Sequence, residues 1–296
     1  MGVDVSVIVT TWNSSRWIAS CVRSLLSQEG VQTELTLVDN GSTDQTLEIM
    51  HREAPHARLI RLHANRGPAY ARNRAIQQAV GRYVLTLDHD VELAPGFLEA
   101  MVEGADRSPR QAGMWTGTIL RPDRRTIDST GMVLTKTWRA FDRGSGAQRL
   151  SPGEAHEAIL GPSACAALYR RAMLEELQDG SGYFDERFFF LWEDIELAWR
   201  AVQRGWQAVY VPEAVCYHVR NGSSLSPRAR QALSFRNRYL FLAKHRLWRP
   251  LSRYLWCCGL YDLARLGVVI LTNPLALRSA GDAWRGGKPA PTLDES

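Results

Sequence analysis

Strand-like and helix-like segments alternate through the first 90 residues, and this alternation restricts the fold more than any other feature. The strand-like segments are Val5–Thr10, Glu34–Val38, Arg58–Leu62 and Tyr83–Leu87. The helix-like segments between them are Trp17–Leu26, Thr46–Arg52 and Ala69–Val80. Alternation at this spacing is typical of a parallel sheet with helices on both faces. The sequence therefore predicts an α/β fold with a mostly parallel sheet.

Each of these four strands ends in a polar loop. The loops are Thr10–Asn13, Asp39–Asp44, His63–Gly67 and Asp88–Asp90. A single loop of this kind is explained by turn chemistry, since Asn, Asp, Ser and Gly are common in turns. Four of them at the carboxyl ends of parallel strands share one edge of the sheet, where α/β proteins bind ligands. Asp88 and Asp90 suit a divalent cation that keeps positions open for substrate phosphates.

Two phosphate-binding motifs are missing from the chain. No G-x-G-x-x-G follows the first strand, and no G-x-x-x-x-G-K-[ST] occurs. Neither a dinucleotide-binding fold nor a P-loop is therefore supported.

A second group of chemically active residues lies in Phe184–Trp206. Its apolar residues recur at helical spacing, at Leu191, Ile195, Ala198 and Val202. This pattern places Glu193 and Asp194 in or just before the first turn of a helix. Acidic residues are favoured there by the helix dipole alone. The adjacent Trp192 and Phe188–Phe190, however, supply apolar surface on which a sugar can stack, and they favour a functional site.

Four motifs in the first 93 residues resemble the nucleotide-sugar half of the family 2 inverting glycosyltransferases. They are VSVIVTTWN, LTLVDNGSTDQT, NRGPAYARNRAI and YVLTLDHD. The resemblance implies a GT-A fold, a nucleoside-diphosphate sugar donor and a divalent metal, Mg²⁺ or Mn²⁺. It assigns donor binding to Thr10, Trp12, Asp39, Arg72 and Asp88. It assigns the metal to Asp90 and to the late histidine, His218, although a lone histidine is more often structural.

The segment around Glu193 and Asp194 resembles the acceptor-side E-D motif of the same family. The resemblance implies that Asp194 is the general base, with Glu193 as the second candidate, and that Trp192 and Gly161 lie on the acceptor side. Residues 161–224 are most similar to bacterial rhamnosyltransferase-like members, which build cell-surface polysaccharide on lipid-linked acceptors. We therefore expect a hexosyl- or rhamnosyl-type transferase with a glycan or lipid-linked acceptor.

The C-terminal region is strongly basic. Between Ala214 and Tyr261 there are nine Lys or Arg residues and no Asp or Glu, whereas the net charge of the whole chain is +5. This predicts a surface that meets anions. A basic helix is expected first, and then an apolar segment, Tyr254–Thr272, that is interrupted by Asp262 and Arg265. Such a segment is a poor transmembrane helix. It suits either a membrane surface or a helical hairpin packed on the domain.

These features predict three regions. Residues 1–224 form the GT-A domain, with a nucleotide-sugar half at 1–93 and an acceptor-side half at 94–224. Residues 225–280 form a basic, amphipathic helical extension, and residues 281–296 form a disordered tail.

The N-terminus carries no signal-peptide pattern, and the five cysteines are scattered. We expect a cytoplasmic protein that can lie peripherally on the inner face of the membrane, against anionic lipid, with no nucleic-acid partner. The alternative is a non-catalytic membrane- or nucleic-acid-binding module on a degenerate transferase scaffold. The presence of every candidate acid and His218 favours the enzyme.

Overall fold

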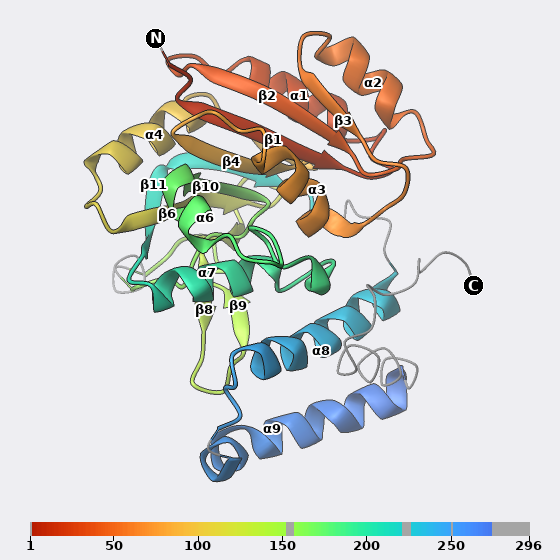
Figure 1. Cartoon of the computed structure of the whole chain (residues 1–296), viewed down its shortest axis with the longest axis vertical. Helices are drawn as coiled ribbons and strands as arrows, with labels where there is room; N and C mark the ends of the chain where they lie inside the picture. Colours follow the sequence, from red (N-terminus) through yellow and green to blue (C-terminus); the bar gives the residue numbers. More distant parts are fainter. Residues whose placement is uncertain (1, 152–156, 221–225, 250, 274–296) are drawn as a thin grey trace.

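One nine-stranded sheet forms the centre of the computed structural model, which describes residues 2–151, 157–220, 226–249 and 251–273 (Figure 1). The strand order is β3-β2-β1-β4-β10-β6-β11-β5, with β7 paired to β6. The first half of the sheet contains β1 (Val5–Thr11), β2 (Thr33–Asp39), β3 (Arg58–Arg61) and β4 (Tyr83–Asp88). These four strands are all parallel. The predicted strands are therefore confirmed to within one or two residues.

The second half of the sheet mixes strand directions. β10 (Ala166–Arg170) lies antiparallel between β4 and β6 (Ala112–Leu120), and β11 (Gln207–His218) is parallel to β6. The short strands β5 (Val91–Leu93) and β7 (Ile127–Ser129) are antiparallel to β11 and β6. Because β6 and β11 run in the same direction as β1–β4, the sheet is mostly parallel, as predicted.

Helices cover both faces of this sheet. One face packs against α1 (Ile18–Leu26), α2 (Thr46–Glu53) and α4 (Phe97–Arg107). The other face packs against α3 (Gly67–Ile76), α6 (Arg171–Leu177) and α7 (Glu193–Gln203). In β1, Val7 and Val9 belong to the first core and Ile8 to the second. This alternation is expected of a strand that is buried on both faces.

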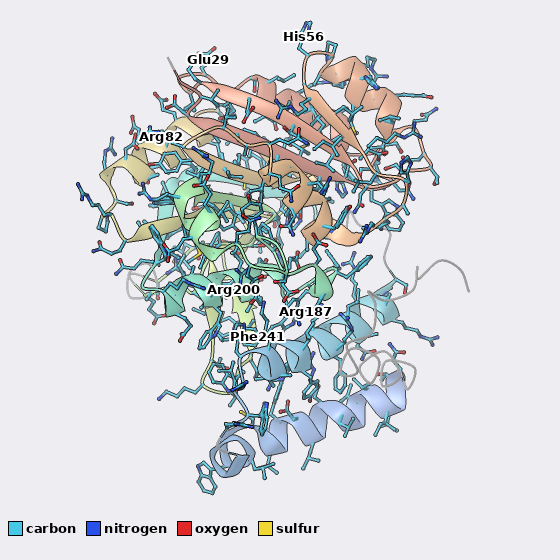
Figure 2. The ribbon with its side chains drawn as sticks, viewed as in Figure 1. Glu29, His56, Arg82, Arg187, Arg200 and Phe241 are labelled. Atoms are coloured by element: carbon cyan, nitrogen blue, oxygen red, sulfur yellow. The ribbon has the colours of Figure 1, made fainter. Side chains whose placement is uncertain are left out.

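The C-terminal extension consists of α8 (Pro227–Lys244) and α9 (Leu251–Thr272). Figure 1 shows that α8 lies between α7 and α9, on the side of the molecule away from β1–β3. A small hairpin, β8 (Met132–Leu134) with β9 (Ala140–Asp142), and the single turn Glu186–Phe188 complete the described elements. Phe241 of α8, labelled in Figure 2, packs with Trp192 and Ile195. The predicted tail, 281–296, lies outside the described residues.

Part of the basic run is used inside the protein, as the packed-hairpin alternative expects. Arg236 and Arg238 are buried in α8. Arg238 pairs with Asp262 of α9, and Lys244 pairs with Asp185 and Glu196. These cations hold the extension to the domain. No helix in the described ranges is long and apolar enough to span a bilayer.

Candidate active site

A cavity of about 720 Å³ opens at the carboxyl ends of β1 and β4. Nine of the eleven predicted site residues line it. Five come from the first half of the sheet, namely Thr10, Trp12, Arg72, Asp88 and Asp90. Four come from the second half, namely Trp192, Glu193, Asp194 and His218. The fold therefore brings the two groups that the sequence analysis identified into one space.

The remaining two predicted residues lie outside this lining. Asp39 is buried at the end of β2, where its Oδ1 accepts a hydrogen bond of 3.2 Å from the backbone of Ser42. Its Oδ2 has no hydrogen-bond partner within the described part of the chain. A Cβ added to Gly161 would lie 2.4 Å from the Cβ of Ala198. Gly161 therefore lets its loop approach α7 closely.

Asp90 and His218 meet because of strand pairing. The last three residues of β11 pair antiparallel with β5, and this pairing sets His218 opposite Val91. His218 Nε2 then lies 3.5 Å from Asp90 Oδ1, and His218 Nδ1 donates a hydrogen bond of 2.9 Å to Asp128. Burial alone lowers the pKa of His218, but the two carboxylates raise it to about 10. The site thus favours a positive charge between these groups.

The donor set fits a cation that is completed by substrate. In the ranges that the structure describes, no three His, Cys, Asp or Glu side chains are arranged to hold a metal by themselves. Asp90 and His218 supply one oxygen and one nitrogen. Mg²⁺ commonly takes one or two protein ligands and fills its other positions with water and substrate phosphates. The hydrogen bond from His218 to Asp128 is the kind of contact that orients a metal-binding histidine.

Arg72 joins the two halves of the site. It is buried in α3, and its Nη2 donates to Asp88 Oδ1 at 2.8 Å. Its Nη1 donates to Glu193 Oε1 at 2.9 Å. One planar guanidinium therefore fixes the end of β4 against the first turn of α7, a geometry that lysine cannot reproduce.

Glu193 and Asp194 differ in their surroundings. Glu193 is 4% exposed and tied to Arg72, whereas Asp194 is half-buried. Asp194 accepts hydrogen bonds from the backbone N–H groups of Ala164, at 3.3 Å, and Ile195, at 2.8 Å. Burial raises the pKa of both carboxyl groups, and the charge of Asp194 raises that of Glu193 further. Carboxylates with raised pKa values are better proton acceptors near neutral pH.

The segment before α7 is strained. Phe189, Leu191 and Trp192 have φ angles of 62°, 69° and 74°, a region that large side chains rarely adopt. Asn237 of α8 lies against this segment, with its Nδ2 2.7–2.9 Å from the carbonyl oxygens of Phe188, Phe190 and Leu191. The buried Asn237 therefore stabilises the backbone that carries Trp192 and the two carboxylates.

The helical pattern predicted for this segment is partly wrong. Leu191 precedes α7, and Val202 is 39% exposed. Ile195 and Ala198 are buried, as expected. Leu191 has a positive φ angle and precedes the helix, which begins at Glu193, so Glu193 and Asp194 lie in its first turn as expected.

Several residues that line or support the cavity were missed by the sequence analysis. Asp128 lies on β7, buried, within reach of His218 and paired with Arg220 at 2.7 Å. Its signal in the sequence is an acidic residue placed beside Ile127 in a strand-like stretch. The cavity also takes Arg139 from the β8–β9 hairpin, Arg230 from α8, and Tyr261 and Arg265 from α9. No local pattern connects these four positions, because only the packing of the extension brings them together.

The order and directions of the strands define a GT-A fold, and solved structures agree. The mannosyltransferase PcManGT from Pyrobaculum calidifontis, solved with GDP-Man and Mn²⁺, superposes with a TM-score of 0.57 at 20% identity, covering 99% of this chain and 77% of that one. S. aureus TarS 1-349 in complex with UDP superposes with a TM-score of 0.54 at 22% identity, covering 81% and 65%. Both likenesses show the fold.

The sequence comparison is more specific. The model of glycosyl transferase family 2 matches residues 6–178, and the chain belongs to this family. A curated relative is the N-acetylglucosaminyl-diphospho-decaprenol L-rhamnosyltransferase of Mycobacterium tuberculosis. It is 30% identical over 269 residues, which cover 82% of this chain and 85% of the relative. The predicted family, fold and enzyme class are confirmed: the protein is a glycosyltransferase.

Proposed function

We propose that this glycosyltransferase is a metal-dependent inverting enzyme with Asp194 as its general base. It moves a sugar from a nucleoside-diphosphate sugar to a hydroxyl group of a glycan or lipid-linked acceptor. One observation carries the proposal: Asp194, from the second half of the sheet, lines the same cavity as the Asp90–His218 pair, which joins the two halves. A base and a leaving-group site that face one cavity are what a single displacement needs.

The reaction is an in-line displacement at the anomeric carbon. The acceptor hydroxyl oxygen forms the new bond to that carbon, and Asp194 takes the hydroxyl proton. The bond from the anomeric carbon to the diphosphate oxygen breaks, and its electron pair leaves with the nucleoside diphosphate. Because attack and departure occur on opposite faces, the configuration is inverted. Asp194 is favoured over Glu193 because Arg72 already engages the Glu193 carboxylate.

Asp90 and His218 would hold the metal, Mg²⁺ or Mn²⁺. When bound, the metal would stabilise negative charge on the departing diphosphate. The fit rests on the carboxylate and imidazole that face each other at 3.5 Å and on the support that Asp128 gives His218. The presence of Mn²⁺ in the PcManGT complex is consistent with this assignment.

The donor would lie over the ends of β1, β2 and β4. Thr10 and Trp12 line the cavity there, and the buried Oδ2 of Asp39, which has no hydrogen-bond partner among the described residues, would accept a hydrogen bond from a base N–H. Asp88 would hold the ribose. We assign to Arg72 a positioning role between Asp88 and Glu193, since both of its Nη groups are engaged by these carboxylates.

The acceptor side is formed by Trp192 and the C-terminal extension. The Mycobacterium tuberculosis relative is named for a diphospho-decaprenol acceptor, and we propose a lipid-linked acceptor here. On α9, apolar side chains form an exposed stripe with Trp256 at 89%, Leu260 at 85% and Leu263 at 66% exposure. Within the described part of α9, the charged residues Asp262 and Arg265 form side-chain hydrogen bonds with α8. We propose that this stripe rests on the inner face of the membrane.

A donor screen tests the proposed function. Melting of the wild type is measured with a panel of nucleotide sugars, with and without Mn²⁺ or Mg²⁺, and compared with Asp90→Ala, Asp194→Asn and the exposed control Glu213→Gln. We expect one donor to raise the Tm in a metal-dependent manner and Asp90→Ala to lose that response. Asp194→Asn should bind the donor but lose about 10²- to 10⁴-fold in transfer rate.

Two results would contradict the proposal. Transfer by Asp194→Asn at the wild-type rate excludes Asp194 as the base. A melting curve that no nucleotide sugar moves, with or without metal, argues against the reaction as a whole.

A further inference from the structure

We infer that the cavity contains a second anion-binding subsite, formed by Arg139, Arg230, Arg265 and Tyr261, which takes the phosphate groups of a lipid-linked acceptor. The inference rests on the proposed function and adds a ligand group and named residues to it. All four side chains line the same cavity as Asp194. We call the three cations the acceptor-side arginines.

The position of these residues separates them from the donor. Arg139 comes from the β8–β9 hairpin, Arg230 from α8 and Arg265 from α9. Figure 1 shows these helices on the side of α7 away from β1–β3, the strands whose ends meet the donor. Asp194 lies in the first turn of α7, the helix between the two regions. The group that Asp194 deprotonates must therefore approach from the side of the acceptor-side arginines.

Aromatic rings and a hydroxyl group hold two of these arginines in place. The guanidinium of Arg139 lies 5.1 Å from the centre of the Tyr261 ring, and that of Arg265 lies 5.6 Å from the Phe235 ring. Arg265 Nη2 also donates to the hydroxyl group of Ser234 at 3.1 Å. Neither Arg139 nor Arg265 forms an ion pair with a carboxylate within the described ranges. Their positions are fixed by these contacts, and their positive charges are available to a ligand.

Two neighbouring arginines, in contrast, are paired with carboxylates of the protein. Arg238, one helical turn from Ser234, pairs with Asp262, and Arg220 pairs with Asp128 and Asp142. Burial and the charge of Arg238 lower the pKa of Arg265, against the opposite effects of Tyr261 and Asp262. An anion that entered this end of the cavity would relieve the repulsion among these cations.

The geometry of α9 explains why the anion belongs to a lipid-linked molecule. Tyr261 and Arg265 are one turn apart on the face of α9 that meets the cavity. Leu260 and Leu263 lie on the exposed apolar stripe of the same helix. A phosphate group bound by the arginines would therefore sit beside a surface suited to the hydrocarbon part of the same molecule. The sugar attached to that phosphate would extend toward Asp194.

The test uses two acceptors that carry the same sugar, one as a polyprenyl diphosphate and one as a neutral alkyl glycoside. Kinetic constants are measured for the full chain, for Arg265→Gln and Arg139→Gln, and for the matched control Arg228→Gln, an exposed position on α8. We expect KM for the diphosphate acceptor to rise about 10- to 100-fold in the first two variants. The donor KM and the KM for the neutral glycoside should stay at the wild-type values, and the control should match the wild type throughout.

Three results would overturn the inference. An equal loss on both acceptors would indicate a purely structural role, a rise in donor KM would assign the arginines to the donor, and unchanged constants would exclude a role in binding.

A binding measurement separates this inference from the reaction itself. Calorimetric titration of the metal-free protein with a short isoprenoid diphosphate should show binding that Arg265→Gln loses and Asp90→Ala retains. That result would stand even if no nucleotide sugar supported transfer, and absence of binding to the wild type would overturn the subsite alone.

Discussion

Asp128 accepts a hydrogen bond of 2.9 Å from Nδ1 of His218, and this contact joins β7 to the end of β11. Asp128 is itself held by Arg220 at 2.7 Å. A carboxylate on one ring nitrogen orients the imidazole and leaves the other nitrogen directed at Asp90. The contact therefore prepares His218 for the role that we propose for it.

Removal of this support should weaken metal activation. In Asp128→Asn the concentration of Mn²⁺ that gives half-maximal activity should rise about 10- to 100-fold, because the orienting carboxylate of the ligand is lost. Asp106→Asn, on α4, serves as the control because it lies outside the cavity lining. Activity is measured across a Mn²⁺ titration at saturating donor. An unchanged titration with Asp128→Asn would refute the orienting role.

Arg72 should prove essential to both structure and rate. Arg72→Gln leaves Asp88 and the buried Glu193 without their shared cation, and breaking a buried pair in this way costs about 3–5 kcal/mol of unfolding free energy. The double variant Arg72→Gln with Glu193→Gln removes the uncompensated charge and should recover part of that loss. Denaturant unfolding of the wild type, both single variants and the double variant measures the coupling. If the two single effects simply add, the bridge is not a stabilising unit.

Asn237 should affect turnover although it belongs to the C-terminal extension. Asn237→Ala removes the side chain that bonds the strained backbone at Phe188–Leu191, so Trp192 and Asp194 lose their fixed position. We expect kcat to fall about 10-fold or more, while donor-induced thermal stabilisation persists. Gln231→Ala, on the same helix, is the matched control. Wild-type kcat in Asn237→Ala would show that α8 does not position the base.

Much of the donor half could be predicted from the sequence, because its information is local. The end of each strand β1, β2 and β4 is marked by apolar residues that give way to polar ones, and parallel pairing alone brings these ends together. Glu193 and Asp194 were also identified from neighbouring residues.

The rest depended on long-range packing. Asp128 meets His218 across 90 positions of sequence, and Tyr261 reaches the cavity only because α9 packs on α8. The sequence also left open whether the basic run lies at a surface or inside the protein. Charge counting does not reveal that Arg236 and Arg238 are buried and bonded within the fold.

The transfer rate should fall on acidification, and it should do so at a higher pH than it would with a base that has the usual pKa of an aspartate. Burial raises the pKa of Asp194, so protonation inactivates the base before the pH reaches the usual range near about 4. We expect kcat/KM to rise with pH and then to level off, with the midpoint of the rise above the usual pKa of an aspartate. The profile is measured from about pH 3.5 to pH 8, and each sample is re-assayed at neutral pH to exclude unfolding. A midpoint at or below the usual pKa of an aspartate would contradict the assignment of Asp194 as a partly buried carboxylate base.

The exposed stripe on α9 should control association with lipid. Replacing Trp256, Leu260 and Leu263 by Gln removes apolar surface that would insert at the bilayer interface, and binding to vesicles should fall about 10-fold or more. Co-sedimentation with vesicles of anionic and of neutral lipid measures it, and Leu26→Gln, an exposed residue of α1, is the control. Because basic residues flank the stripe, the wild type should prefer anionic vesicles, and salt should weaken that preference. Self-association of the wild type that the triple variant abolishes, with vesicle binding absent in both, would instead assign the stripe to contact with a second copy of the chain.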